Sequence, residues 1–203
     1  MVSSLLHETV LVRIESRLKE LVRQTTAAWA ADPGRADAEA EGGGVVRAKL
    51  ELADPDFAPC CEHPLVAAAA TAVLGRDWHL AGLGVRVSLP GSGHQGLHAD
   101  FAQHRTDRPW QTLSAMWCIT AFTPDNGPLR VIPGSHRVSE PPIDLEAWAS
   151  GMGPHPDEVK IVAPAGSVIL FNSADLWHSG THNYSPAPRL AVTAGFGPGS
   201  PSC

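Results

Sequence analysis

The sequence predicts a mainly β fold with flanking helices, arranged as a double-stranded β-helix of the jelly-roll or cupin-like type. The longer stretches of helical periodicity lie in the first part of the chain, up to about residue 77. From about residue 78 to 197, short apolar segments alternate at even spacing with turns rich in glycine and proline, which is typical of jelly rolls. The chain has 203 residues, the size of an ordinary domain, and we expect residues 1–203 to form a single domain.

Composition and charge argue against several classes of protein. The formal net charge is -6, the sequence pI is near 5.9, and lysine and arginine do not cluster, so a nucleic-acid partner is not expected. The longest apolar stretch, residues 65–74, is about half the length that a bilayer requires, and charges early in the chain argue against a signal peptide. The four cysteines have neither zinc-site nor disulfide-framework spacing, which favours a reduced, cytoplasmic protein. The sequence does not indicate an oligomeric state.

The spacing of apolar residues, together with residues typical of helix ends, predicts the helices. Apolar residues recur at three- and four-residue steps over residues 5–31, which predicts an amphipathic helix packed on the outside of a sheet. His63-Pro64 is typical of a helix start and Gly75 of a helix end, so a second helix is expected to reach residue 74. A third, short helix is expected around residues 145–148.

Short apolar segments between turn signals predict the strands. Asp125-Asn126-Gly127-Pro128 is the strongest of these turn signals. The turn at residues 90–93 leads into an expected strand around residues 94–101. The other expected strands are residues 45–52, 78–89, 110–122, 129–132, 158–162, 167–171 and 190–196.

The segment from His94 to Phe101 carries the most informative spacing in the chain. His98 and Asp100 are two residues apart, so on an extended strand both side chains leave by the same face. An imidazole beside a carboxylate suits Fe(II), Mn(II) or Zn(II), and His178 is the best candidate for a third ligand. Such a set of two histidines and one carboxylate leaves adjacent positions of an octahedral iron open. The alternative is a surface pair of His98 and Asp100 joined by a hydrogen bond.

Arg189 follows His178 by eleven residues, on the next expected strand. A hairpin returning from His178 would bring Arg189 back alongside it, with the guanidinium deeper in the barrel. An arginine at this place can hold a carboxylate through two hydrogen bonds. A keto acid with a second carboxylate, such as 2-oxoglutarate, could chelate the metal and end on Arg189. The alternatives are a structural role for His178 and a surface ion pair for Arg189.

Four fragments resemble, in content and in order, the motifs of the phytanoyl-CoA dioxygenase family of Fe(II)- and 2-oxoglutarate-dependent oxygenases. The resemblance covers about residues 78–196, and it implies that His98, Asp100 and His178 hold iron. It also implies that Arg189 binds the distal carboxylate of 2-oxoglutarate. The fragments are Gln95-Gly96-Leu97-His98-Ala99-Asp100, Asn126-Gly127-Pro128-Leu129-Arg130-Val131-Ile132-Pro133-Gly134-Ser135-His136, Ala165-Gly166-Ser167-Val168-Ile169-Leu170-Phe171-Asn172, and Trp177-His178-Ser179-Gly180 with Asn183 and Arg189.

Further residues are weaker candidates for the same site. Family members often place a polar co-substrate contact where Gln95 stands, and Trp117 could flank the co-substrate or pack in the core. Phe101, His104 and His136 are candidate substrate contacts. The alternatives are core packing for Phe101 and a hydrogen bond that orders a loop for His136.

The resemblance implies an enzyme that oxidises a small molecule with Fe(II), 2-oxoglutarate and O2. Halogenating relatives lack the carboxylate ligand, so Asp100 favours hydroxylation, desaturation, epoxidation or ring formation. The chain has three lysines and twelve arginines, a bias typical of GC-rich bacteria, and no basic patch for a CoA phosphate, which favours secondary metabolism. Two alternatives stay open: a non-catalytic jelly roll that binds a metal or metabolite, and a zinc hydrolase, which would leave Arg189 without a role.

Overall fold

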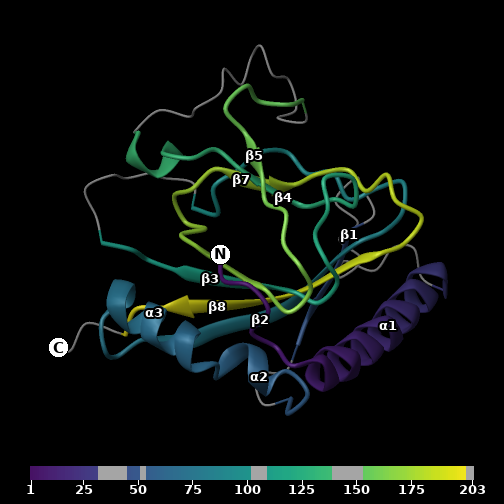
Figure 1. Ribbon diagram of the computed structural model, residues 1–203, viewed down its shortest axis with the longest axis horizontal. Helices are drawn as coiled ribbons and strands as arrows, with labels where there is room; N and C mark the ends of the chain where they lie inside the picture. The colour runs from purple at the N-terminus through teal and green to yellow at the C-terminus, as the bar shows by residue number, and fades with distance from the viewer. Residues whose placement is uncertain (32–44, 51–53, 102–108, 139–152, 200–203) are drawn as a thin grey trace.

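Two antiparallel β-sheets lie one above the other at the centre of the fold (Figure 1). The computed structural model describes residues 1–31, 45–50, 54–101, 109–138 and 153–199. The larger sheet has the strand order β1 (Val45–Lys49), β2 (His79–Ser88), β8 (Arg189–Gly197), β3 (Leu113–Cys118) and β6 (Val168–Phe171). The smaller sheet has the order β5 (Val159–Lys160), β4 (Leu129–Val131) and β7 (His178–Gly180).

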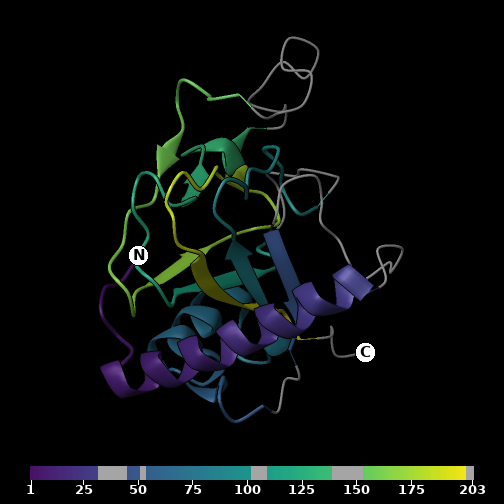
Figure 2. The ribbon, with the colours of Figure 1, turned by 90° about the vertical axis from the view of Figure 1, so that its right-hand side faces the viewer.

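Three α-helices cover the outer face of the larger sheet, as Figures 1 and 2 show. They are α1 (Glu8–Ala31), α2 (Ala58–Cys61) and α3 (Pro64–Leu74), and a short 3₁₀-helix, η1 (Ser135–Arg137), follows β4. In α1, Ile14 and Leu18 are fully buried one turn apart, so the apolar stripe faces the sheet. The N-cap of α3 is His63, whose ring accepts a hydrogen bond from the Leu65 N–H, and Gly75 ends the helix with a φ of 90°.

Alternation along the strands of the larger sheet separates two environments. On β2, Leu83, Val85 and Val87 belong to the main core, together with residues of all three helices. The residues between them, including Arg86, point the other way, towards the smaller sheet. The same alternation on β8 places Arg189 on this inner face. The space between the sheets therefore receives polar side chains from strands that also build the core.

The predicted mainly β architecture, with two antiparallel sheets and few helices, is confirmed. The first helix begins at Glu8, later than expected, because the preceding residues pair with the larger sheet. Val2 forms a bridge with Val168, and the Leu5 N–H donates to the Gly166 carbonyl. The expected strand over residues 110–122 is shorter, and α2 and η1 were not expected.

The helix expected around residues 145–148 lies outside the described residues. No helix in the described part of the chain is long and apolar enough to cross a membrane.

Gly127 stands where the backbone leaves no room for a side chain. Its φ is +78°, and an added Cβ would lie 2.6 Å from Ser88 Oγ and 2.9 Å from the Thr181 carbonyl oxygen. We expect Gly127→Ala to lower the free energy of unfolding, measured by urea denaturation, by about 3 kcal/mol, because strain and steric overlap add. Gly134→Ala is the matched control, since its φ is +85° with open space around it, and it should cost only about 1–2 kcal/mol. Equal losses in the two variants would show that the close approach is unimportant.

Candidate metal centre and adjoining cavity

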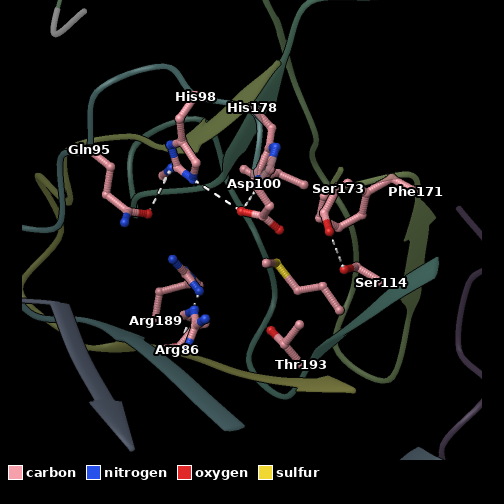
Figure 3. A pocket seen from close by; sticks show the side chains of 13 residues that line it. Arg86, Gln95, His98, Asp100, Ser114, Phe171, Ser173, His178, Arg189 and Thr193 are labelled. Carbon is pink, nitrogen blue, oxygen red and sulfur yellow. Dashed lines mark hydrogen bonds and ion pairs between the residues drawn. The ribbon is translucent and has the colours of Figure 1, made fainter. Parts of the chain in front are cut away.

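Three side chains that can ligate a metal meet at one edge of the space between the sheets. The ligand atoms of His98, Asp100 and His178 all lie within 4.8 Å of one another. The Asp100 Oδ1 atom is 3.7 Å from His98 Nε2 and 3.9 Å from His178 Nε2, so the carboxylate faces both rings (Figure 3). Within the described residues, no other group of three histidine, cysteine or acidic side chains is placed to hold a metal ion.

Backbone hydrogen bonds join the segments that carry these side chains. The His98 N–H donates to the His178 carbonyl at 3.1 Å, and the His178 N–H donates to the His98 carbonyl at 2.8 Å. The Asp100 N–H donates to the carbonyl of Ser173, just after β6, at 2.9 Å. The regular strand expected around residues 94–101 is wrong, because His98 forms only an isolated bridge and Asp100 follows in a bend. The two side chains converge through this local geometry instead.

The two imidazoles are held with equivalent nitrogens towards the carboxylate. His98 Nδ1 lies 2.8 Å from the Gly96 carbonyl oxygen, and His178 Nδ1 lies 2.8 Å from the Leu176 carbonyl oxygen. Since a carbonyl only accepts, each Nδ1 carries the proton and each Nε2 presents its lone pair. This is the arrangement in which histidines ligate metals, with the second nitrogen fixed by a backbone acceptor.

The environment of His178 favours its neutral form. Burial, and then the neighbouring His98, lower the pKa of His178 from 6.5 to about 4, and Asp100 opposes this shift. At neutral pH the ring is therefore uncharged, as a ligand must be. Asp100, by contrast, has a side chain that is 46% exposed, so solvent reaches the open side of the cluster.

The lowered pKa of His178 predicts that the metal-free protein loses stability in mild acid. The unfolded chain binds a proton near pH 6.5 that the folded protein binds only near pH 4. The free energy of unfolding should therefore be fully present above pH 6.5 and fall, by about 3 kcal/mol from this group, as the pH approaches 4. Urea titrations from pH 7.5 to 4 would measure this slope. His178→Gln should flatten it and the exposed-site control His79→Gln should not; equal slopes would contradict the assignment.

A cavity of about 110 Å³ runs between the sheets from the metal cluster to Arg189. Its walls carry the apolar side chains of Met116, Leu129 and Phe171. Its polar lining includes Thr193, whose hydroxyl is buried without a hydrogen-bond partner in the described part of the chain. Apolar and polar side chains therefore both line the cavity, with the metal cluster at one end and Arg189 at the other.

Arg189 is a buried cation at the far end of this cavity. Its side chain donates to the Gly127 carbonyl at 3.0 Å and to the Arg86 carbonyl at 3.2 Å, and its guanidinium lies over the Phe122 ring at 4.7 Å. Burial lowers the pKa of Arg189 to about 10, with Cys118 acting in the opposite direction, so the group stays charged at neutral pH. No carboxylate of the described residues pairs with it. A buried guanidinium without an anionic partner is suited to receive one from a ligand.

The hairpin expected between His178 and Arg189 is wrong. β7, which begins at His178, pairs with β4 in the smaller sheet, whereas β8, which begins at Arg189, pairs with β2 and β3 in the larger sheet. The chain crosses between the sheets after β7. The two residues therefore face each other across the cavity instead of lying side by side (Figure 3).

The weaker candidates are distributed unevenly around the site. Gln95 lines the cavity, where its Oε1 atom accepts a hydrogen bond from the Gly180 N–H at 3.2 Å. Phe101 is 41% exposed and lies outside the residues that line the cavity, and His136 contacts the Arg137 side chain on η1. His104 lies outside the described residues.

Trp117 belongs to the core and does not flank the cavity. It is fully buried among the residues facing the helices, and its Nε1–H donates to the Cys60 carbonyl at 2.9 Å. Its neighbour Met116 points to the opposite face of β3 and lines the cavity. These contacts agree with the alternative, core packing, and give no support to the co-substrate contact expected for Trp117.

Sequence reasoning missed several residues that line the cavity. Arg86 on β2 lies next to Arg189, and Ser114 donates a hydrogen bond to Ser173 at 2.9 Å near the metal cluster (Figure 3). The signal for Arg86 is visible in the alternation of β2, where a charge stands on the face opposite Val85 and Val87. Such a charge inside an otherwise apolar strand indicates an inward polar position.

The fold and site define a two-sheet protein with a candidate metal centre and a cationic pocket beside it. The family model described as phytanoyl-CoA dioxygenase (PhyH) matches residues 1–191. The chain therefore belongs to the phytanoyl-CoA dioxygenase family, which confirms the resemblance inferred from its motifs.

Several relatives are dioxygenases from fungi and bacteria. The chain is 35% identical to dioxygenase trt7 of Aspergillus terreus over 142 residues, which cover 64% of this chain and 46% of that protein. It is 38% identical to the iron/alpha-ketoglutarate-dependent dioxygenase okaE of Penicillium ochrochloron over 107 residues, or 49% and 32% of the two chains. It is 27% identical to ectoine dioxygenase of Bordetella parapertussis over 167 residues, or 70% and 54%. In these matches the aligned part spans about half or less of each relative.

Solved structures share the fold at low sequence identity. HygX from Streptomyces hygroscopicus, solved with nickel and 2-oxoglutarate bound, superposes with a TM-score of 0.70 at 19% identity, covering 97% of this chain and 81% of that chain. The non-heme alpha ketoglutarate dependent epimerase SnoN from nogalamycin biosynthesis gives a TM-score of 0.69 at 20% identity, covering 97% and 75%.

Proposed function

We propose that this protein is an Fe(II)- and 2-oxoglutarate-dependent dioxygenase. His98, Asp100 and His178 would hold the iron, and Arg189 would bind the distal carboxylate of the co-substrate. One observation carries the proposal: three converging ligand atoms and a buried guanidinium, which no carboxylate of the described residues pairs with, occupy opposite ends of one cavity. The two sheets would then form a double-stranded β-helix, with a core over about residues 78–197 in a single domain.

The residues fit the metal and co-substrate that the family implies. Two imidazole nitrogens and one carboxylate oxygen on one side of an ion are the donor set of non-haem Fe(II) oxygenases, and they leave adjacent positions open. When bound, iron and 2-oxoglutarate would together use O2 to oxidise the substrate, with succinate and CO2 as the other products. A zinc hydrolase with the same ligands would not account for the buried charge of Arg189.

The chain itself supplies orientation and the exclusion of water. Arg189 fixes the co-substrate at one end, so its keto-acid end is directed towards the metal ligands. The apolar side chains of Met116, Leu129 and Phe171 cover part of the space between these ends and would limit the access of water to it. Gln95 lies near the metal cluster and is placed to orient the co-substrate through its carboxamide.

The substrate would be a small molecule that enters from the exposed side of Asp100. HygX has also been solved with hygromycin B bound, and SnoN with nogalamycin RO, so the fold accommodates such ligands in those proteins. We propose oxidation of a secondary metabolite in a bacterial cytoplasm, in keeping with the arginine-rich composition. Fungal relatives such as trt7 show that sequence similarity alone does not identify the kingdom.

Spectroscopy without oxygen tests the proposal before any substrate is known. Adding Fe(II) and 2-oxoglutarate anaerobically should produce a weak visible metal-to-ligand charge-transfer band, and admitting O2 should release succinate slowly. Tight metal or metabolite binding with no oxygen uptake would favour a non-catalytic binder. Activity that zinc restores in the absence of oxygen would favour a hydrolase.

A further inference from the structure

We propose that Arg130 is a positioning residue that holds the two histidine-bearing segments in register and so sets the metal affinity of the site. The inference rests on the proposed function and concerns a side chain outside the cavity. Arg130 lies in the middle of β4 and is 1% exposed. Its neighbours Leu129 and Val131 pack towards the larger sheet, so its guanidinium lies on the other face of the smaller sheet.

The guanidinium joins three segments that are distant in sequence. Its Nε–H donates to Ser179 Oγ at 2.6 Å, and its Nη2 donates to the Gln95 carbonyl at 3.2 Å. Its Nη1 donates to Glu158 Oε2 at 2.9 Å and to the Gly153 carbonyl at 2.7 Å. Glu158 is itself held in place, because the same carboxylate oxygen accepts from the His155 N–H at 3.1 Å. Burying a cation is costly unless it is paired and hydrogen-bonded, and these partners provide both.

Two of these contacts lie next to the proposed metal ligands. Ser179 directly follows His178 on β7, and β4 pairs with β7 so that Arg130 stands opposite Ser179. Gln95 precedes His98 by three residues, and its side chain also contacts Gly180. One guanidinium thus hydrogen-bonds to both ligand-bearing segments on the face of the smaller sheet that points away from the cavity. The backbone pair of His98 and His178 joins the same segments at the metal site. Loss of the guanidinium would remove this second connection and leave the two segments joined by the backbone pair and by the hydrogen bond between Gln95 and Gly180.

The arrangement requires arginine rather than any cation. Its planar group directs separate N–H bonds at Ser179, Glu158 and the Gln95 carbonyl from fixed directions. A lysine ammonium could keep the charge pair with Glu158 but could not reach all three groups at once. If only the charge of Arg130 mattered, Arg130→Lys would therefore keep the metal affinity of the wild-type protein. If the hydrogen bonds that position the ligand segments matter, Arg130→Lys would bind the metal more weakly.

The test measures binding of Ni(II) alone to the metal-free protein by calorimetry under argon, together with the melting temperature. Wild-type protein should bind one ion, and Arg130→Lys should bind it about 10- to 100-fold more weakly, the loss typical when groups supporting metal ligands are changed. Ser179→Ala, which removes one contact, should lose roughly 3- to 10-fold. Leu18→Ala, in the fully buried stripe of α1, is the control, since it should lower the melting temperature without changing the affinity.

The outcomes separate this inference from the proposed function. Wild-type affinity in Arg130→Lys or in Ser179→Ala would overturn the positioning role while leaving the metal centre standing. A loss of affinity in Leu18→Ala as large as in Arg130→Lys would also overturn it, because general destabilisation would then explain both. Failure of the wild-type protein to bind Ni(II) would overturn the proposed function, and the positioning role with it. Should Arg130→Lys not fold, Ser179→Ala decides.

Discussion

Asp100→Ala is expected to abolish iron-dependent turnover and to weaken metal binding by more than about 100-fold. Changes to groups that only support metal ligands cost about 10- to 100-fold, so removing a ligand should cost more. The fold should survive, because the Asp100 side chain is 46% exposed and its structural hydrogen bond to Ser173 comes from the backbone. The loss should therefore come from the metal centre rather than from unfolding.

Calorimetric Ni(II) titration, succinate release and the melting temperature of the metal-free protein measure the effect of Asp100→Ala. The matched control is Asp125→Ala, which removes an exposed carboxylate from the turn before β4 and should leave all three readings unchanged. If Asp100→Ala binds the ion as tightly as the wild-type protein does, the carboxylate is no ligand. Of the three proposed ligands, only the two histidines would then remain.

Arg189→Met is expected to weaken 2-oxoglutarate binding on the order of 100-fold while metal affinity is retained. Truncating one partner of a buried, hydrogen-bonded charge pair costs about 2–5 kcal/mol, and a 100-fold loss of affinity, about 2.7 kcal/mol, lies within this range. In the absence of co-substrate, the variant should lose little stability, because it removes a buried cation that has no anionic partner in the described part of the chain. The function of Arg189 would thus appear in ligand binding and not in folding.

Thermal denaturation of the Ni(II)-loaded protein with increasing 2-oxoglutarate measures this difference. The wild-type melting temperature should rise with ligand concentration, and that of Arg189→Met should stay nearly constant. Arg137→Met, a change at an exposed arginine of η1, is the control and should behave as the wild-type protein. An unchanged requirement for 2-oxoglutarate in Arg189→Met would show that the carboxylate is held elsewhere.

How far the sequence could predict the structure differs between residues. The strand β2 and the helix α3 could be predicted because alternation and end signals act over neighbouring residues. The orientation of Trp117 could not, because every residue of β3 is buried and no polar alternation marks a face. The alternation of β2 indicates that Arg86 points inward, but only the structure shows that it lines the same cavity as Arg189.

Pairing of distant strands was the main feature beyond the reach of the sequence. The short separation of His178 and Arg189 favoured a hairpin, yet each strand found its partners elsewhere. Arg130 showed no sign of its role either, because its contacts come from segments tens of residues away. Local patterns specify which face of a strand is apolar, but they do not specify which strand it pairs with.

The sequence by itself determined the chemistry that this protein can offer: imidazoles, a carboxylate and a guanidinium, in motifs whose order identified the family. Only the tertiary structure decided that these groups share one cavity, with Arg189 across from the metal ligands and Arg130 behind them. The physical reason is that residue types and short spacings are local properties, whereas the meeting of His98 with His178 depends on backbone pairing between segments eighty residues apart. That pairing follows from packing the whole chain around its core.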